Sequence, residues 1–465
     1  MSRDSNKSAE ERESVRKFEQ MLKNGGSCFF DLNTYESIIN HYIEDGKFKK
    51  ALKACDHALN LYPYSVELMV EKANLLLRKQ DFQEALDLVN QASLYQPYDL
   101  DLTILKANIY SQLNDLKSAL SILEDALNMF EEKDQIYYAL GMAYQDASEF
   151  DKAIEEYKKA LDFNFNNEDV IYELAYCLDL TGKMEQSLAY YQKFIDADPF
   201  SYYAWYNMGI VYFKLGRFED AISAYEYAVA INEDFSSAYC NMGNCYVNMG
   251  LLDKAIESYS LTLEHEDPSA EIYCSIASCY EKLKDWPKVI ENYKKATQLD
   301  PYCDDAWSGI GKALMETEKF FEAIHYFKKA LKIDNENAEY WMGKAESEYH
   351  TGNVISCLEA YEEVINLDPQ NMDAWLNWSF VFYEQGDTEK ALEILVDAIN
   401  EFTEGAELYY RAAAYLIIAG NYKEAFIYLE NALILDFEKH TLLYDFFPEL
   451  ETQKALHKII EQYRK

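Results

Sequence analysis

The sequence predicts an all-α protein, a solenoid of antiparallel helix pairs, and three observations support this fold class. One phrase recurs along the 465 residues: an alanine, then an aromatic or aliphatic residue four positions on, then a second alanine three further on. Glycine and proline number only 16 and 8, whereas tyrosine alone numbers 40. Few turn formers among many large apolar residues are typical of helices joined by short loops.

The recurring phrase has a period of 34 residues. Its first alanine is found at Ala51, Ala85, Ala119, Ala153, Ala221, Ala255, Ala323, Ala391 and Ala425, so every gap is 34 or 68. The skipped positions hold Ser187, Val289 and Cys357, which gives twelve repeats without an insertion or a deletion. Self-similarity at a fixed period of this length indicates a repeat architecture.

Two further positions of the repeat hold small residues in the same register. The second alanine of the phrase recurs at the same spacing, for example at Ala58, Ala160 and Ala228. A third position holds Gly141 or Gly209 in some repeats and alanine in most others. Small residues let two helix backbones approach closely while large neighbours fill the grooves between them. Each repeat is therefore predicted to form one pair of antiparallel helices.

Glycine and proline mark the ends of the two helices in each repeat. Seven glycines share one phase between the two helical patterns, where a left-handed residue is needed to end the first helix; they are Gly46, Gly182, Gly216, Gly250, Gly352, Gly386 and Gly420. Five prolines share a second phase, where the second helix has to stop; they are Pro63, Pro97, Pro199, Pro301 and Pro369.

With these residues the chain resembles the tetratricopeptide repeat family. The repeat from Tyr202 to Phe235 matches best, and it carries Trp205, Gly209, Tyr212, Phe218, Ala221, Tyr225 and Ala228. It departs from the family at Glu233, where proline is usual. The resemblance implies a right-handed superhelical α-solenoid in which the first helices of the repeats line a concave groove.

The twelve repeats are expected to span residues 32–439, with capping segments on both sides. A terminal repeat would otherwise leave an apolar face bare. Residues 1–31 are interpreted as a disordered start and a capping helix with Val15, Phe18, Met21 and Leu22 on one stripe, ended by Gly25 and Gly26. Residues 440–465 are interpreted as C-terminal capping helices, the first of them cut short by Pro448.

The charge of the chain restricts its partners. There are 82 acidic and 43 basic side chains, a formal net charge of −39. Such a field repels phosphate backbones and anionic lipid surfaces, so nucleic acid and membranes are not expected as partners. The polar N-terminal stretch has no apolar core of a signal peptide, and no run of residues reaches membrane-spanning length. An acidic cytoplasmic protein is expected.

The resemblance places the second, fifth, sixth, ninth, twelfth and thirteenth residues of each repeat on the groove. Asparagines recur at these positions: Asn40, Asn74, Asn108 and Asn244 at the ninth, and Asn207 and Asn241 at the sixth. An asparagine amide both donates and accepts, so it can pair with the main chain of an extended peptide. The alternative is that these are solvated polar residues on a helix face.

Three aromatic residues accompany the central asparagines on the same predicted side. Tyr203, Tyr206 and Phe213 would anchor a partner if they were exposed in the groove. The alternative is that they pack between neighbouring first helices.

The sequence contains no motif that indicates catalysis or a cofactor. Cys240, Cys245, Cys274 and Cys279 form two pairs one repeat apart, and four thiols could suggest zinc. However, a spacing of five residues turns paired thiols to different helix faces, which favours packing over metal binding. The seven histidines show no metal-ligand spacing, and no phosphate loop or nucleophile elbow is present.

The predicted function is therefore a non-enzymatic scaffold without cofactor or metal that binds protein or peptide segments in its concave groove. The alternative is a structural subunit of a multiprotein complex, or of a homo-oligomer, that makes contacts through its caps and its convex face.

Overall fold

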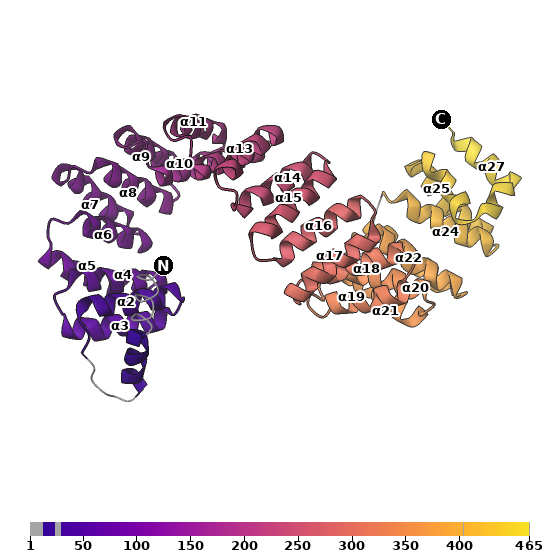
Figure 1. The fold of residues 1–465 in the computed structure, drawn as a ribbon. Helices are drawn as coiled ribbons and strands as arrows, with labels where there is room; N and C mark the ends of the chain where they lie inside the picture. Colours follow the sequence, from indigo (N-terminus) through magenta and orange to yellow (C-terminus); the bar gives the residue numbers. More distant parts are fainter. Residues whose placement is uncertain (1–12, 24–28, 403, 465) are drawn as a thin grey trace. The chain divides into compact units, whose positions relative to one another are not determined.

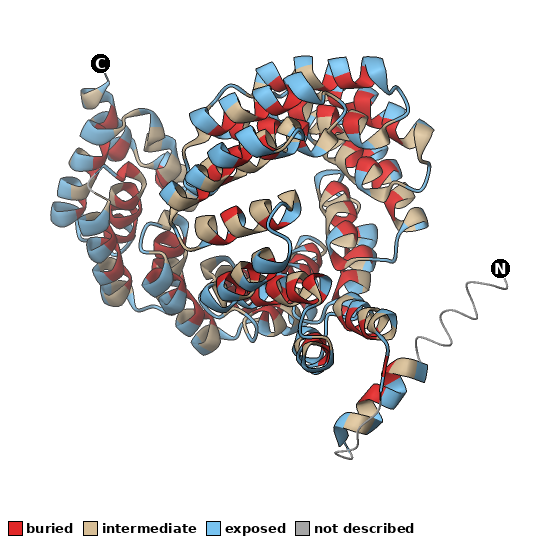
Figure 2. Cartoon of the chain, turned by 90° about the vertical axis from the view of Figure 1, so that its left-hand side faces the viewer, coloured by how far each residue is buried: buried red, intermediate tan, exposed pale blue. Residues whose placement is uncertain are grey.

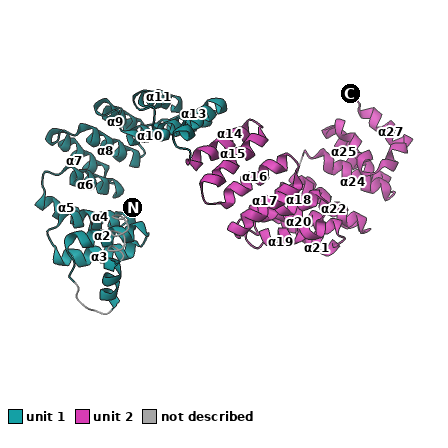
Figure 3. Ribbon diagram, viewed as in Figure 1, with its two compact units in different colours: residues 1–233 teal, residues 234–465 magenta. Residues whose placement is uncertain are grey.

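The computed structural model describes residues 13–23, 29–402 and 404–464, and within these ranges it contains helices and no strand (Figure 1). The chain divides into two compact units, residues 1–233 and 234–465 (Figure 3). The division falls directly after Glu233, one of several positions at which a repeat has no proline at this phase. The prediction of an all-α solenoid of helix pairs is confirmed.

The first unit is built from consecutive helix pairs that begin after the helix at residues 13–23. Its helices are α2 (Leu32–Glu44), α3 (Phe48–Leu61), α4 (Val66–Lys79), α5 (Phe82–Tyr95), α6 (Leu100–Gln112), α7 (Leu116–Met129), α8 (Lys133–Asp146), α9 (Phe150–Phe163), α10 (Glu168–Leu180), α11 (Ser187–Ala197), α12 (Tyr202–Lys214) and α13 (Phe218–Ile231), with the 3-10 helix η1 (Met184–Gln186) before α11.

The second unit continues the same alternation and ends in several short helices. Its repeat helices are α14 (Ser236–Asn248), α15 (Leu252–His265), α16 (Ala270–Lys282), α17 (Trp286–Leu299), α18 (Asp304–Glu316), α19 (Phe320–Ala330), α20 (Ala338–His350), α21 (Val354–Leu367), α22 (Met372–Glu384), α23 (Thr388–Glu401), α24 (Ala406–Ile418) and α25 (Tyr422–Leu435). After them come η2 (Glu438–Thr441), α26 (Leu442–Phe446), η3 (Pro448–Thr452), α27 (Lys454–Ile460) and η4 (Glu461–Tyr463).

The small residues of the repeat lie where the two helices of a pair meet. Ala221 and Ala228 of α13 are fully buried. A methyl group added at Gly209 of α12 would lie 2.5 Å from a ring carbon of Tyr225, which is itself buried. The buried residues follow the facing sides of the helices, with exposed residues on the outer sides (Figure 2). Close backbone approach is thus the physical reason for the small residues.

A left-handed residue ends the first helix of every repeat. The seven predicted glycines have φ between 68° and 83°. Five non-glycine residues adopt the same conformation at the same phase, with φ between 57° and 68°; they are Gln80, Asn114, Ser148, Lys284 and Glu318. After Gly216, for example, the amide of Arg217 donates to the carbonyl of Tyr212 at 2.9 Å, as in a Schellman motif.

The loops between repeats are held by tryptophans of the following first helix. The indole nitrogen Nε1 of Trp205 donates to the carbonyl of Pro199 at 3.1 Å, and Trp307 does the same to Pro301 at 3.0 Å. The second helices end two residues before these prolines, at Ala197 and Leu299. The second helices therefore end at the predicted phase, but α13, which has no proline there, ends at the same phase at Ile231.

At the N-terminal end, the helix at residues 13–23 covers the first repeat. Phe18 is fully buried and its ring contacts the rings of Phe30 and Tyr35 at centroid distances of 6.2 and 6.1 Å. Val15 is also buried, but Leu22, predicted on the same stripe, is 37% exposed. The predicted disordered start at residues 1–12 and the stop at Gly25 and Gly26 lie outside the described residues.

At the C-terminal end, short helices pack on the last repeat. Leu456 and Ile460 of α27 are buried, and the hydroxyl of Tyr463 donates to Glu430 Oε1 at 2.7 Å. The ring of Phe446 in α26 lies 3.4 Å from the guanidinium carbon of Arg411. This contact helps to bury Arg411, which lies on α24, the first helix of the last repeat. Burial lowers the pKa of Arg411.

Candidate functional site

We define the first-helix face as the second, fifth, sixth, ninth, twelfth and thirteenth residues of the repeats. In the first unit these positions surround a cavity of about 480 Å³ between α2, α4 and α6. Its lining residues are Glu36, Ile39, Asn40, Val66, Glu67, Val70, Glu71, Gln96, Asp99, Asp101 and Leu102. Five carboxylates and no basic residue line it, so this cavity favours a basic or neutral occupant.

A second cavity of about 290 Å³ lies on the first-helix face between α6 and α8. Ile104, Tyr138 and Met142 give it an apolar lining, and Asn108 and Ser111 contribute polar groups. The Ser111 Oγ is buried and has no hydrogen-bond partner. A mostly apolar cavity with a few polar groups is the usual form of a binding pocket.

Burial also changes the pKa of Tyr138, which lines this cavity. Desolvation, with smaller contributions from Glu173 and Asp169, raises the pKa of Tyr138. The phenol therefore stays protonated and can donate a hydrogen bond across the physiological pH range. Together with the amide of Asn108 and the hydroxyl of Ser111, it provides donors for the carbonyl groups of a peptide.

In the second unit, a cavity of about 440 Å³ lies between α16 and α18, with contributions from the second helices. Ser275, Ser278, Glu281, Asp305 and Lys312 supply its polar groups. Burial raises the pKa of Glu281. Both units thus carry cavities on their first-helix face, and each is lined within its own unit.

The three asparagines of the first repeats are exposed at their predicted positions. Asn40, on α2, lines the acidic cavity, and Asn108, on α6, lines the apolar one. Asn74, on α4, is exposed but lines neither cavity. Two of the three predicted contact residues therefore lie beside a cavity that a side chain could enter.

The central candidates of the first unit lie on α12. Tyr203 is 50% exposed, and its ring lies 4.2 Å from that of Tyr202. Tyr206 and Asn207 are partly buried, and the ring of Tyr206 lies 5.7 Å from that of Tyr225 on α13. Phe213 makes an edge contact with Phe218 at 5.6 Å. Tyr206 and Phe213 therefore pack within their own repeat, while Tyr203 offers the most exposed ring of the three.

The central candidates of the second unit lie on α14, and one of them already has a structural role. The hydroxyl of Tyr259, which lines the cavity of this unit, donates to Asn244 Oδ1 at 2.7 Å. The Nδ2 of Asn244 lies 3.4 Å from Asn241 Oδ1. Asn244 therefore orients a buried tyrosine, a contact that its spacing in the sequence does not reveal.

The four cysteines considered for zinc do not gather into one cluster. Cys245 and Cys279 are buried, and burial raises the pKa of the Cys245 thiol to about 12. Cys274 instead faces Cys303, with 3.8 Å between the two sulfur atoms. Among the described residues no group of three or more His, Cys, Asp or Glu side chains could hold a metal ion.

Sequence reasoning did not single out the residues that line the apolar cavity with Asn108. Ser111, Gln135, Tyr138 and Met142 all occupy groove positions of their repeats, but their residue types differ from repeat to repeat. None of them is an asparagine that recurs at one phase of the repeat. Reading the six groove positions of neighbouring repeats together would have found them.

Comparison with protein families gives matches along most of the chain. Models described as tetratricopeptide repeat match residues 169–201, 202–235, 236–263, 270–303, 304–337 and 373–404. A model described as the N-terminal tetratricopeptide repeat region of Psidin matches residues 37–153. The chain belongs to the tetratricopeptide repeat family. As a tetratricopeptide repeat protein it is a scaffold for protein–protein interaction.

Several solved structures are similar to this tetratricopeptide repeat protein. MamA is 30% identical, with 35% of this chain and 95% of that chain covered and a TM-score of 0.32. YrrB, described as having an unusual peptide-binding site, is 18% identical over 40% of this chain and 95% of its own, with a TM-score of 0.36. The Cut9–Hcn1 hetero-tetramer of the APC/C is 13% identical over 90% of this chain and 96% of that chain, with a TM-score of 0.36. No curated protein matches the chain.

No helix in the part of the chain that the structure describes is both long enough and apolar enough to cross a lipid bilayer.

Proposed function

We propose that this tetratricopeptide repeat protein is a non-enzymatic cytoplasmic scaffold that binds an extended segment of a partner protein on its first-helix face. The observation that carries the proposal is the apolar cavity between α6 and α8, with the buried and unpartnered hydroxyl of Ser111 beside Asn108. A buried polar atom without a partner costs free energy, and a ligand that supplies the missing hydrogen bond recovers it.

The proposed mechanism combines an anchor with main-chain recognition. An aliphatic or aromatic side chain of the partner enters the space lined by Ile104, Tyr138 and Met142. Asn108 then donates to and accepts from the main chain of the same segment, and Ser111 completes the set. Because the helices are already stacked, little of the binding free energy is spent on ordering the scaffold.

The cytoplasmic location in this proposal is supported by the cysteines. All eight cysteines in the described ranges are free thiols, and five of them are buried. Thiols of this kind are usual in compartments that keep cysteine reduced.

The proposal is tested by affinity capture from native lysate with quantitative mass spectrometry. Wild type is compared with the double variant Asn108→Ala, Ser111→Ala. The matched control carries Asn128→Ala and Ser121→Ala, the same two changes at exposed positions of α7 in the same repeat. We expect at least one protein to be captured by wild type and control but lost, by about tenfold or more, from the cavity variant.

Equal capture of every partner by the cavity variant and the control would contradict binding at this cavity. A second variant, Asn207→Ala with Asn241→Ala and Asn244→Ala, tests the central positions in the same assay. Circular dichroism of each purified variant establishes first that it remains folded.

The alternative function, an assembly subunit with contacts along its edge, is favoured by a different observation. Tyr64 and Tyr98 follow the loop prolines of their repeats and are 72% and 82% exposed, and Phe200 is 78% exposed at the same phase. Exposed aromatic rings in a row are typical of protein interfaces. Light scattering at several concentrations, with Tyr64→Ser and Tyr98→Ser as the variant, separates self-association from groove binding.

A further inference from the structure

A cavity of about 510 Å³ lies at the turn between α2 and α3 and the C-terminal end of α4, and Arg78 alone of its lining residues occupies a position of the first-helix face. Its lining residues are Gly46, Lys47, Phe48, Lys49, Lys50, Leu52, Leu75, Arg78 and Lys79. Five of the nine are basic and none is acidic, in a chain with 82 acidic and 43 basic side chains. We call these residues the basic pocket.

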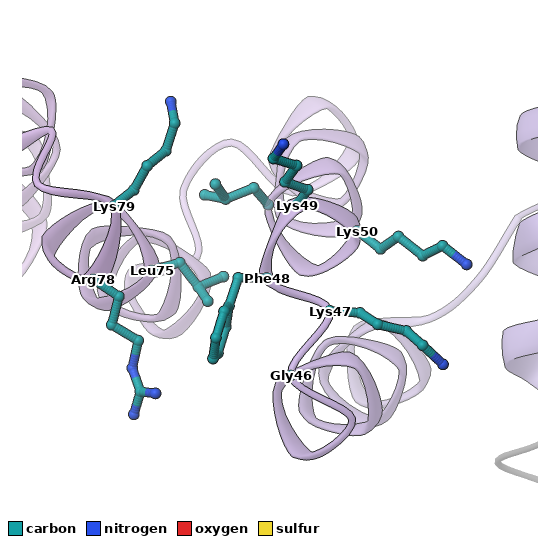
Figure 4. Close-up of a pocket in the computed structure, with 9 residues that line it drawn as sticks. Gly46, Lys47, Phe48, Lys49, Lys50, Leu75, Arg78 and Lys79 are labelled. Carbon is teal, nitrogen blue, oxygen red and sulfur yellow. The ribbon is translucent and has the colours of Figure 1, made fainter. Parts of the chain in front are cut away.

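The centre of the basic pocket is apolar. Figure 4 shows Phe48 and Leu75 side by side with Arg78 near them, while Lys47 and Lys50 extend away from this apolar centre. Phe48 is 38% exposed, and the guanidinium carbon of Arg78 lies 5.4 Å from the centroid of its ring. The space is large enough for one apolar side chain of a ligand, and the ring is available to contact it.

Three of the five cations already have carboxylate partners. Lys47 pairs with Asp45 at 2.6 Å, Lys50 with Glu19 at 2.6 Å and Lys79 with Asp81 at 2.5 Å. Among the described residues, Lys49 and Arg78 have no such partner. Lys49 lies on α3 and Arg78 lies on α4, the two helices that border the apolar centre. Two positive charges therefore remain for a ligand.

The start of α3 adds to the positive potential. Lysines occupy its N-cap and the second and third positions, and its first turn contains no acidic residue and no side-chain cap. The positive end of a helix dipole is an unfavourable place for cations and a favourable one for anions. A carboxylate near Lys49 would therefore be attracted both by the side chain and by the helix end.

Extended polyanions do not fit the surroundings of this pocket. The formal net charge is −39, and the neighbouring cavity between α2, α4 and α6 is lined by five carboxylates. Attraction to the basic pocket is screened within about 8 Å at physiological salt, so a nucleic acid or a membrane surface would meet acidic protein beyond it. A short segment with few charges stays within the pocket.

We propose that the basic pocket is a second binding site, distinct from the apolar cavity between α6 and α8, for an acidic peptide segment of a partner protein that carries one aromatic or large aliphatic residue between carboxylates. The apolar residue of the segment packs on Phe48 and Leu75. Its flanking carboxylates pair with Lys49 and Arg78. The site recognises two charges and one apolar side chain of the segment, and it operates whether or not the apolar cavity between α6 and α8 is occupied.

The test is fluorescence anisotropy with a fluorescein-labelled hexapeptide probe. The probe contains one phenylalanine, and its five remaining residues are glutamate. Wild type is expected to bind it saturably below about 1 mM, more weakly as salt is raised. The double variant Lys49→Gln, Arg78→Gln is expected to bind at least tenfold more weakly. The control variant Lys53→Gln, Lys117→Gln changes the net charge equally at exposed lysines outside the pocket and is expected to bind as wild type does.

Absence of saturable binding, or equal binding by the pocket variant and the control, would overturn the proposal. Equal affinity for a probe with alanine in place of phenylalanine would overturn the anchor. Binding of oligo-dT or of phosphatidylserine vesicles that depends on Lys49 and Arg78, without binding of the peptide, would overturn the assignment to a peptide. The cavity variant Asn108→Ala, Ser111→Ala is expected to bind the probe unchanged, which separates this site from the proposed function.

Discussion

Ala221 lies in the tightest part of the α12–α13 pair, where neither helix has room for a larger side chain. It is fully buried, and so is its helix neighbour Tyr225, which already contacts Gly209 across the pair. Overpacking a site of this kind forces side chains out of their rotamers and shifts the backbone.

We expect Ala221→Leu to lower the free energy of unfolding by about 1–3 kcal/mol. Ala230→Leu places the same side chain at an exposed position of the same helix and is expected to change it by less than about 0.5 kcal/mol. Thermal and urea unfolding measure both. Equal stability of the two variants would show that the assignment of small positions is wrong.

Asn244 provides a second prediction at the residue scale, because it serves the fold as well as the proposed groove. Replacing it by alanine removes the acceptor of the buried Tyr259 hydroxyl. We expect Asn244→Ala to cost about 1 kcal/mol of stability, and Asn40→Ala, at an exposed position, to cost almost nothing. If denaturant unfolding gave the same midpoint for both, the hydrogen bond of Asn244 would not contribute to stability.

At the scale of single helices, the turn between the two helices of a repeat illustrates what the sequence reveals and what it leaves out. Seven of the twelve left-handed turn residues are glycines, and their phase predicts the conformation. Lys284 and Glu318 carry no such signal, yet they adopt φ of 59° and 57°. The repeat on either side of them enforces the turn, and this tertiary constraint cannot be read from the residue itself.

Exchanging residues at this turn has opposite expected effects in different repeats. Gly216 has φ of 73° and open space around it, so Gly216→Ala is expected to cost about 1–2 kcal/mol through backbone strain alone. Glu318→Gly is expected to raise the stability by up to about 1 kcal/mol, because it relieves the same strain. Calorimetry of both variants tests the pair, and destabilisation by Glu318→Gly would contradict the strain argument.

The binding surfaces were only partly predictable at the scale of helices. The period of 34 places Asn40 and Asn108 on the first-helix face, where cavities are found. The basic pocket depends on the meeting of Phe48 with Leu75, which are 27 residues apart. Phe48 occupies the same phase as Phe82, Phe150 and Phe218, so the repeat pattern did not distinguish this pocket from the corresponding places in other repeats. Similarly, the structural partner of Asn244 lies on another helix, so spacing alone could not identify it.

At the scale of the whole molecule, the sequence predicts the register of the repeats but not the division into two units. The phase of the repeats was readable throughout, since no insertion interrupts it between the first repeat and the last. The division into two units after Glu233 was not predicted. Its one sequence signal is the missing proline at that phase, and the same phase lacks proline in other repeats that are not divided.

The net charge of −39 gives stability a characteristic pH dependence. Burial raises the pKa of Glu281 and Glu346, so these groups hold protons more tightly in the folded state. The stability they add is present at low pH and is lost as the pH rises through their folded pKa. Salt-bridged Glu19 has a lowered pKa, and its contribution is lost as the pH falls through that value.

We therefore expect the melting temperature to rise as the pH is lowered from 7.5, because self-repulsion decreases and because the buried carboxyls take up protons once the pH falls through their raised pKa. Below about pH 4 it is expected to fall, because carboxylates in ion pairs are then protonated. Differential scanning fluorimetry at constant ionic strength follows both limbs. A melting temperature that fell steadily from pH 7.5 downward would contradict this balance.

The first-helix face, rather than the second helices, is proposed to contact a partner protein. The most direct measurement is site-specific photo-crosslinking in cells with benzoylphenylalanine at Tyr138, in the apolar cavity, and at Leu94, an 80% exposed residue of the second helix α5. We expect a crosslinked partner from position 138 and none from position 94. A partner crosslinked only from position 94 would contradict it and favour assembly through the outer surface.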